Sequence, residues 1–403
     1  MLIRNQHPDY RKPLAAEDAE TLGVTAADAV ERFLAHRPNH RATPLRALPS
    51  LAADLGIGAI HLKDEGYRLG LGSFKALGGA YAVIRLVLEA AERELGRPLG
   101  IADLRTPDVA KISSAMTFGC ATDGNHGRSV AQGAQLVGAR SVIFVHGGVS
   151  DARVEAIARY GAEMVRVAGT YDDSVAEAAR VCESKGWTVV SDTSWPGYER
   201  IPGLVMQGYT AIMREALEKL PAPPTHVFVQ AGVGGIAAAT AAYLADRFGE
   251  ARPTFVVVDP ARAACIFETA RAGHPVKLQH GEPTVMAMLE CYEPSLLAWR
   301  ILSRTADAFM TVEDEDAVEV MNRLARPLGH DPVVVAGESG AAGMAGLFRA
   351  ARDSEMRAAI GLDRNSRVLL IVTEGATDPD RYRELVGIGP DDLAASQAAV
   401  AAK

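Results

Sequence analysis

The sequence predicts an α/β fold with two parallel-sheet lobes, and three patterns in its 403 residues support this. From Asp123 onward, segments with helical periodicity alternate with short apolar runs rich in β-branched residues. These runs are continuous rather than alternating, as in strands buried on both faces of a sheet. The alternation stops at the Pro-Ala-Pro-Pro turn signal of residues 221–224 and then restarts. We therefore expect two lobes built from βαβ units, with a cleft between them.

The predicted elements fall into two series. The first series contains strands at 141–145, 164–167 and 187–190, and helices at 127–137, after the N-cap candidate Ser150, and at 176–183. The second contains strands at 226–229, 255–258 and 368–372, and helices at 235–248, 260–272, 295–304, 313–326 and 338–352. We expect a large domain formed by 1–90 and 205–403, and a small α/β domain formed by 91–204.

Composition excludes several classes of protein. The formal net charge of −8 argues against a nucleic-acid partner, which usually needs a basic face. No run of ~18 apolar residues predicts a membrane span, and the first ten residues lack an apolar signal core, so we expect a cytoplasmic protein. None of the four cysteines forms a C-x-x-C pair, so no metal site is expected. Free thiols are the default in a reducing cytosol, although Cys265 and Cys291 are close enough in sequence to leave a disulfide open.

Lys75 lies in a glycine-rich segment directly before a predicted amphipathic helix. Gly70 and Gly72 suit an irregular loop, and the helix that follows has Ile84 and Leu88 on one apolar face. A positive charge at a helix start is opposed by the helix dipole, so an ordinary surface lysine is disfavoured there. A lysine held away from water is instead a good amine nucleophile toward an aldehyde.

Three further segments have the form of ligand-binding sites. Residues 121–128, Ala-Thr-Asp-Gly-Asn-His-Gly-Arg, open a helix whose first N–H groups would hold a carboxylate. Residues 230–237, Gln-Ala-Gly-Val-Gly-Gly-Ile-Ala, join a strand to a helix, and such a turn cradles phosphate. The strand at 368–372 ends in Thr373 and Glu374, at the strand end where α/β proteins bind ligands.

The turn at 230–237 also allows a dinucleotide-binding interpretation. Gly232, Gly234 and Ala237 fit the G-x-G-x-x-A pattern, and Asp259 ends the next strand about 20 residues later. That interpretation explains one segment of the four and gives Lys75 no role. A non-catalytic ligand-binding regulator on the same fold is a third alternative, which the presence of Lys75 disfavours.

In this order, the four segments resemble the fold-type II pyridoxal-phosphate enzymes, a group that includes the tryptophan synthase β chain and the threonine dehydratases. The sequence is most similar to the diaminopropionate ammonia-lyase family, from about residue 30 to Leu385. The matching segments are Phe74-Lys75 with 77–81, 121–128, Asp192-Thr193 before Trp195, Ile201-Pro202, 206–209, 230–234, 337–341 and 373–375.

The resemblance implies the tryptophan synthase β-like fold type II, with pyridoxal 5'-phosphate bound by the larger domain as a Schiff base to Lys75. It implies that Asn125 bonds the phenolic oxygen of the cofactor and that Thr373 meets its pyridine nitrogen. The implied cofactor-binding set is Phe74, Lys75, Asn125, Gly232, Val233, Gly234, Gly235 and Thr373. It also implies a small amino-acid substrate and a homodimer.

The implied reaction is α,β-elimination of ammonia from D- or L-2,3-diaminopropionate to give pyruvate and ammonia. Lys75 would remove the Cα proton, and Asp123 and Asp192 would bind the β-ammonium or move protons. The substrate carboxylate would lie on the loop formed by Thr122, Asp123, Gly124 and His126. Serine, threonine or hydroxyaspartate would need the same lysine and loop, so a dehydratase is the alternative. Asp123 favours diaminopropionate, because dehydratases generally have a small or apolar residue there.

Overall fold

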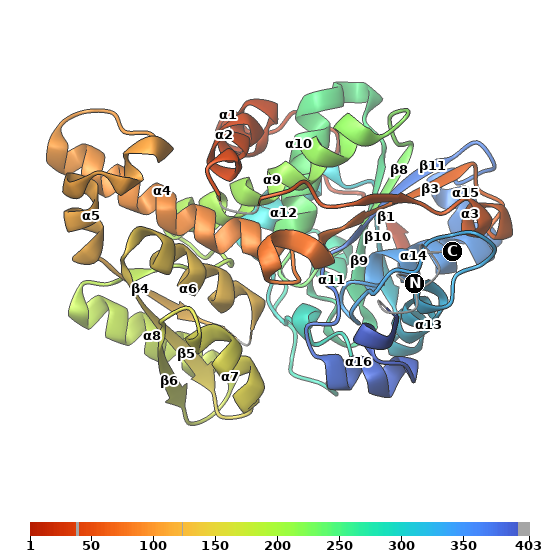
Figure 1. The fold of residues 1–403 in the computed structure, drawn as a ribbon. Helices are drawn as coiled ribbons and strands as arrows, with labels where there is room; N and C mark the ends of the chain where they lie inside the picture. Colours follow the sequence, from red (N-terminus) through yellow and green to blue (C-terminus); the bar gives the residue numbers. More distant parts are fainter. Residues whose placement is uncertain (38–39, 123, 394–403) are drawn as a thin grey trace. The chain divides into compact units, whose positions relative to one another are not determined.

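The computed structural model describes residues 1–37, 40–122 and 124–393. The contacts within the chain define two compact units (Figure 1). Unit 1 comprises Met1–Val24, Ala42–Phe74 and Ile212–Lys403, and unit 2 comprises Thr25–Arg41 and Lys75–Ala211. The division into 1–90 with 205–403 and 91–204 stays a prediction about the domains.

Unit 1 contains a seven-stranded sheet in the order β1-β10-β9-β8-β11-β3-β2. Its strands are β1 Leu2–Arg4, β2 Leu45–Ala47, β3 Ala59–Asp64, β8 His226–Gln230, β9 Thr254–Pro260, β10 Ala308–Val312 and β11 Arg367–Val372. The inner strands run parallel, and nearly all their residues are buried, as their continuous apolar sequences predict. The edge strands β1 and β2 pair antiparallel with β10 and β3, so the sheet is mixed, not wholly parallel as predicted.

Helices cover this sheet, and α14 packs against β8, β9, β10 and β11. The helices of unit 1 are α1 Ala16–Leu22, α3 Pro49–Asp54, α10 Gly235–Phe248, α11 Cys265–Ala272, α12 Leu296–Thr305, α13 Asp314–Ala325, α14 Ala342–Arg352, α15 Ser354–Ile360 and α16 Pro379–Val386. Short 3-10 segments are η1 Glu65–Gly70, η3 Gly249–Ala251, η4 Ala261–Ala263 and η5 Ala287–Leu289. The main buried core lies between the inner strands and helices α3, α13 and α14.

Unit 2 contains a four-stranded parallel sheet in the order β6-β5-β4-β7. Its strands are β4 Thr117–Ala121, β5 Arg140–His146, β6 Glu163–Val167 and β7 Thr188–Val189. Its helices are α2 Val24–Ala35, α4 Lys75–Leu95, η2 Ile101–Arg105, α5 Pro107–Ser114, α6 Asn125–Val137, α7 Asp151–Ala158 and α8 Tyr171–Lys185, and α9 Arg200–Lys219 continues into unit 1. Helices α6 and α8 pack against the sheet (Figure 1). Ser150 caps α7 as predicted, since its side chain accepts a hydrogen bond from the Arg153 N–H.

The four cysteines are free thiols: Cys120, Cys182 and Cys265 are buried, and Cys291 is partly exposed. The pairing of Cys265 with Cys291 that the sequence left open is therefore not made. Within the described part of the chain, no helix has the length and apolar character needed to cross a membrane.

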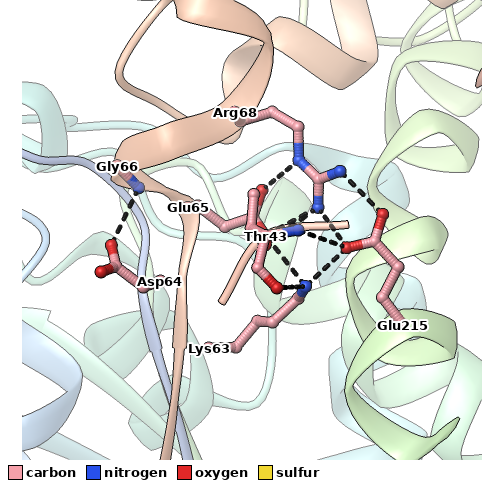
Figure 2. A network of polar contacts seen from close by, with 7 residues as sticks. All are labelled: Thr43, Lys63, Asp64, Glu65, Gly66, Arg68 and Glu215. Atoms are coloured by element: carbon pink, nitrogen blue, oxygen red, sulfur yellow. Dashed lines mark hydrogen bonds and ion pairs between the residues drawn. The ribbon is translucent and has the colours of Figure 1, made fainter. Parts of the chain in front are cut away.

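A buried ionic network in unit 1 holds the turn that leads to Lys75 (Figure 2). The Arg68 guanidinium donates to both Glu65 oxygens at 2.7 and 2.8 Å, and to both Glu215 oxygens at 2.7 and 2.8 Å. Lys63 also pairs with Glu215, so two cations meet two anions. The next residue, Leu69, has φ of 49°, which is unusual for a residue with a side chain. The network therefore stabilises a strained turn just before the candidate catalytic lysine.

Replacing Glu215 with glutamine is expected to lower the free energy of unfolding by about 3 kcal/mol, because Lys63 and Arg68 lose their shared counter-charge. Burial alone would raise the pKa of Glu215, but its bonds to Arg68 and the charge of Lys63 lower it from 4.5 to about 2. This stabilisation is complete well above pH 4.5 and disappears as the pH falls from 4.5 to 2. Urea unfolding at several pH values measures it. Glu218→Gln on the exposed side of the same helix should change stability by less than about 0.5 kcal/mol.

Candidate active site

Lys75 is the first residue of α4, as predicted, and it forms an ion pair with Asp192. The Lys75 Nζ donates to Asp192 Oδ2, although the two residues are 117 positions apart. Burial alone would raise the pKa of Asp192, but the positive charge of Lys75 and its hydrogen bond hold that pKa well below its usual range. Asp192 is therefore ionised at neutral pH, and it compensates a positive charge that the start of α4 disfavours.

The first turn of α6 brings His126 to the same place. The His126 Nε2–H donates to the Val190 carbonyl at 2.9 Å, and its Nδ1 lies 3.9 Å from Asp192 Oδ2. Burial lowers the pKa of His126, so the ring favours its neutral form. Lys75, His126 and Asp192, all predicted site residues, thus form one cluster in unit 2.

The structure also describes the predicted site residues Thr122 and Asn125 in this segment, but not Asp123. The Thr122 hydroxyl oxygen accepts hydrogen bonds from the N–H groups of Gly124 and Gly127 at 3.1 and 3.2 Å, so it orders the start of α6. Asn125 is buried in the first turn of α6, where its Oδ1 accepts a weak bond from Arg128 at 3.4 Å. Asp123 lies outside the described residues.

Tyr209 is a site neighbour that the sequence analysis did not assign. It lies on α9 and is 2% exposed, and a Cβ at Gly78 in the first turn of α4 would be 2.6 Å from its ring. Burial raises the pKa of Tyr209, while the charge of Lys75 acts in the opposite direction. The glycines of 78–79 and 208 gave a sequence signal for this close approach of two helices, but not for its location at the lysine.

The turn at 232–235 in unit 1 has the geometry of a phosphate cradle. Among the described residues, none accepts a hydrogen bond from the N–H groups of this turn, whereas the Val233 carbonyl is held by the Ser295 N–H at 3.0 Å. Gly234 has φ of 98°, and a Cβ there would lie 3.0 Å from the Ala298 side chain. Helix α10 begins at the next residue, so its positive end adds to this set of N–H donors. The residues present fit a bound phosphate group.

Thr373 and Phe74 contact each other through their backbones in unit 1. The Phe74 N–H donates to the Thr373 carbonyl at 2.9 Å, and Ser73 forms an isolated bridge with Glu374. Lys75 is covalently joined to Phe74, so the end of β11 fixes the chain immediately before the lysine. The Thr373 hydroxyl oxygen accepts a hydrogen bond from the side chain of Gln230 at 2.9 Å. Gln230 is a second residue that the sequence analysis quoted but gave no role.

Asp259 does not have the position that the dinucleotide interpretation requires. It is 1% exposed, and its Oδ2 accepts a hydrogen bond from the Phe267 N–H at 2.9 Å, in the first turn of α11. Burial raises the pKa of Asp259 well above its usual value. In the dinucleotide-binding interpretation, Asp259 would bind the ligand. In the structure it instead accepts a hydrogen bond from the first turn of α11 inside the protein.

Comparison with known proteins shows the family to which the chain belongs. Residues 36–374 match the family model described as pyridoxal-phosphate dependent enzyme. The chain therefore belongs to the pyridoxal-phosphate-dependent enzymes, and its cofactor is pyridoxal 5'-phosphate. It is 38% identical over 399 residues to the diaminopropionate ammonia-lyase of Salmonella typhimurium, covering 96% of this chain and 98% of that one. Within the larger group, the chain belongs to the diaminopropionate ammonia-lyase family.

Solved structures support the same assignment. A crystal structure of Escherichia coli diaminopropionate ammonia lyase, in complex with an aminoacrylate-PLP azomethine reaction intermediate, is similar with a TM-score of 0.86 and 35% identity over 98% of each chain. Threonine deaminase isoform 2 of Solanum lycopersicum has a TM-score of 0.74 at 20% identity, covering 96% of this chain and 98% of that one, and shows the fold alone. The predicted fold-type II architecture is confirmed.

Proposed function

We propose that this chain converts 2,3-diaminopropionate and one water to pyruvate and two molecules of ammonia. Among the described residues, the ionised Asp192 beside Lys75 is the observation that supports this substrate choice, to which Asp123 is expected to add a second carboxylate. To take the Cα proton, the released Lys75 amine must be neutral, and Asp192 then needs another cation nearby. The β-ammonium of diaminopropionate supplies one, and the hydroxyl of serine does not.

The cofactor-binding roles are those that the family resemblance implies, and the contacts within each unit support them. Lys75 would hold the aldehyde carbon, the N–H groups of 232–235 would hold the phosphate, and Thr373 would meet the pyridine nitrogen. Asn125 would bond the phenolic oxygen. Bound pyridoxal phosphate supplies electron withdrawal from the substrate Cα, which makes that C–H bond acidic.

The protein supplies the proton transfers. The released Lys75 amine would take the Cα proton from one face, and Asp123 would take it from the opposite enantiomer. The loop of 122–126 would hold the substrate carboxylate at the start of α6. Asp192, whose Oδ2 lies 3.9 Å from His126 Nδ1, would bind the β-nitrogen of the substrate as an ammonium. The β-nitrogen must be protonated in this way when it leaves.

The experiment is a substrate panel scored for pyruvate. D- and L-diaminopropionate should react with kcat/KM on the order of 10²-fold or more above serine and threonine. Ammonia should be released in a 2:1 ratio to pyruvate from diaminopropionate and 1:1 from serine. Equal turnover of serine and diaminopropionate would show that the chain is a dehydratase on the same fold.

Replacing Thr373 with aspartate is expected to raise side transamination relative to elimination. A carboxylate favours a protonated pyridine nitrogen, which withdraws electrons more strongly than a neutral one. The Gln230 amide, 2.9 Å from the Thr373 hydroxyl oxygen, can donate to the new carboxylate as well. The ratio of pyridoxamine phosphate to pyruvate measures the effect, and Thr373→Ser should keep the original ratio. An unchanged ratio with normal cofactor binding would place another residue at the nitrogen.

We also infer that the chain acts in the cytoplasm as a homodimer. The family resemblance supports the dimer, and the four free cysteines fit a reducing compartment. Sedimentation equilibrium of the holoenzyme and fractionation of the native cells test the two statements separately.

A further inference from the structure

Gln230 ends β8, and its side chain is wholly buried, with 0% exposed. Its amide nitrogen lies among carbonyl oxygens from two segments: those of Ser339 and Gly340 at 3.1 Å, and that of Ile371 at 3.2 Å. The same nitrogen lies 2.9 Å from the Thr373 hydroxyl oxygen. The amide thus reaches the last residues of β11 and the segment before α14 at once.

These contacts fix which way the amide faces. Carbonyl oxygens only accept hydrogen bonds, so the NH₂ group must be on their side and the amide oxygen on the other. Within the part of the chain that the structure describes, Gln230 Oε1 has no hydrogen-bond partner. It lies against Gly343, where a Cβ would be 2.7 Å away. All the polar contacts of this side chain are therefore made by its nitrogen, whose two N–H bonds are shared among four acceptors.

The direction of the Thr373 hydroxyl proton follows from the amide. Since the hydroxyl oxygen accepts from Gln230, its own proton must point away from Gln230. The bond from Gln230 is the only one that the described residues make to this hydroxyl. The proton is therefore available to a ligand that reaches the end of β11.

We propose that Gln230 is a positioning residue: it directs the Thr373 hydroxyl proton to the pyridine nitrogen of bound pyridoxal phosphate and so keeps that nitrogen unprotonated. The inference rests on the placement of Thr373 proposed above. Without the amide, the carbonyls of Ser339, Gly340 and Ile371 lose their donor, and we expect the Thr373 hydroxyl, which shares that donor with them, to turn its proton toward one of them. Once its proton turns to a carbonyl, the hydroxyl oxygen can only accept from the ring, which favours the protonated nitrogen.

The test reconstitutes the apoprotein with pyridoxal phosphate labelled with ¹⁵N in the ring, at fixed neutral pH. The wild type should show the chemical shift of an unprotonated, hydrogen-bonded pyridine nitrogen. Gln230→Met should move that shift toward the pyridinium value and weaken cofactor binding by up to about tenfold, the value of one hydrogen bond. If Gln230→Met does not fold, Gln230→Asn withdraws the amide from Thr373 but keeps it polar, and the same shift is expected.

A double-mutant comparison separates positioning from a purely structural role. In a Thr373→Val background, Gln230→Met should leave the ¹⁵N shift where Thr373→Val alone puts it, because the residue through which Gln230 acts is gone. A purely structural Gln230 would lower the melting temperature of the holoenzyme but leave the ¹⁵N shift unmoved, and that result overturns the inference. A protonated nitrogen in the wild type, or a Thr373→Val variant with the wild-type shift, overturns it too. Pyruvate release by the same wild-type sample reports on the proposed substrate, so failure of the proposed function is read independently.

Discussion

Replacing Lys75 with alanine is expected to lower kcat/KM for diaminopropionate by at least about 10³-fold. The lysine amine has two roles in the proposed reaction, since it binds the cofactor aldehyde and then takes the Cα proton. Proton transfer by a positioned group alone contributes roughly 10²- to 10⁴-fold. The ion pair with Asp192 holds this amine in place at the start of α4, and no other lysine is part of the described cluster.

The measurement combines pyruvate release with chemical labelling. Borohydride should bleach the yellow wild-type protein and leave a stable adduct on the peptide containing Lys75, and the alanine variant should give no such adduct. Lys111→Ala, an exposed lysine on α5, is the matched control and should keep activity and label. A wild-type adduct on any other lysine would contradict the assignment.

The periodicity of the sequence predicted most of the parallel strands and crossover helices. Helix 235–248 has the predicted limits, and the strand predicted at 187–190 is shortened to Thr188–Val189. These elements carry their own signals, such as a glycine turn before a helix or a run of β-branched residues. Local sequence is therefore sufficient to predict a strand that is buried on both faces of a sheet, or a helix whose start is marked by a cap.

Elements that depend on distant partners were missed. Strands β1 and β2 have three residues each, and they exist because β10 and β3 offer an edge for pairing. Helix α9 was also missed; Pro202 lies in its first turn, where proline is tolerated because its missing N–H needs no helical partner. The pairing of β1 and β2 depends on strands far away in the sequence, so nearby residues do not reveal it.

Parts of the candidate site were likewise predictable from local sequence, whereas the contacts between distant residues were not. Lys75 and the turn at 232–235 were predicted because a loop–helix junction is itself a local signal. The Lys75–Asp192 contact joins residues 117 positions apart, and the Gln230 amide reaches Thr373 across 143 positions. No pattern within one segment specifies such contacts, so the resemblance could suggest Asp192 but not its partner. The roles of the individual site residues stay predictions.

The last prediction concerns Asp123, the residue that we expect to distinguish this chain from the dehydratases. Replacing Asp123 with asparagine is expected to remove most of the preference for diaminopropionate over serine, a loss on the order of 10²-fold in the ratio of kcat/KM values. A carboxylate near the substrate carboxylate is unfavourable unless a cation lies near both. The β-ammonium of diaminopropionate is that cation, and stripping its partner leaves a charge uncompensated in a water-poor site, which costs a few kcal/mol.

The same replacement should abolish most activity on the D enantiomer, because asparagine cannot take the Cα proton that Lys75 cannot reach. Activity on the L form should fall less, since the Lys75 amine serves that face. Pyruvate release from D- and L-diaminopropionate, serine and threonine by both proteins measures these effects. Asp192→Asn distinguishes the two carboxylates: it removes the partner of Lys75 and a carboxylate proposed for the β-ammonium, so it should lower activity on both enantiomers alike. Equal loss of D and L activity in Asp123→Asn would show that Asp123 binds the ammonium only, and that the proton of the D form goes elsewhere.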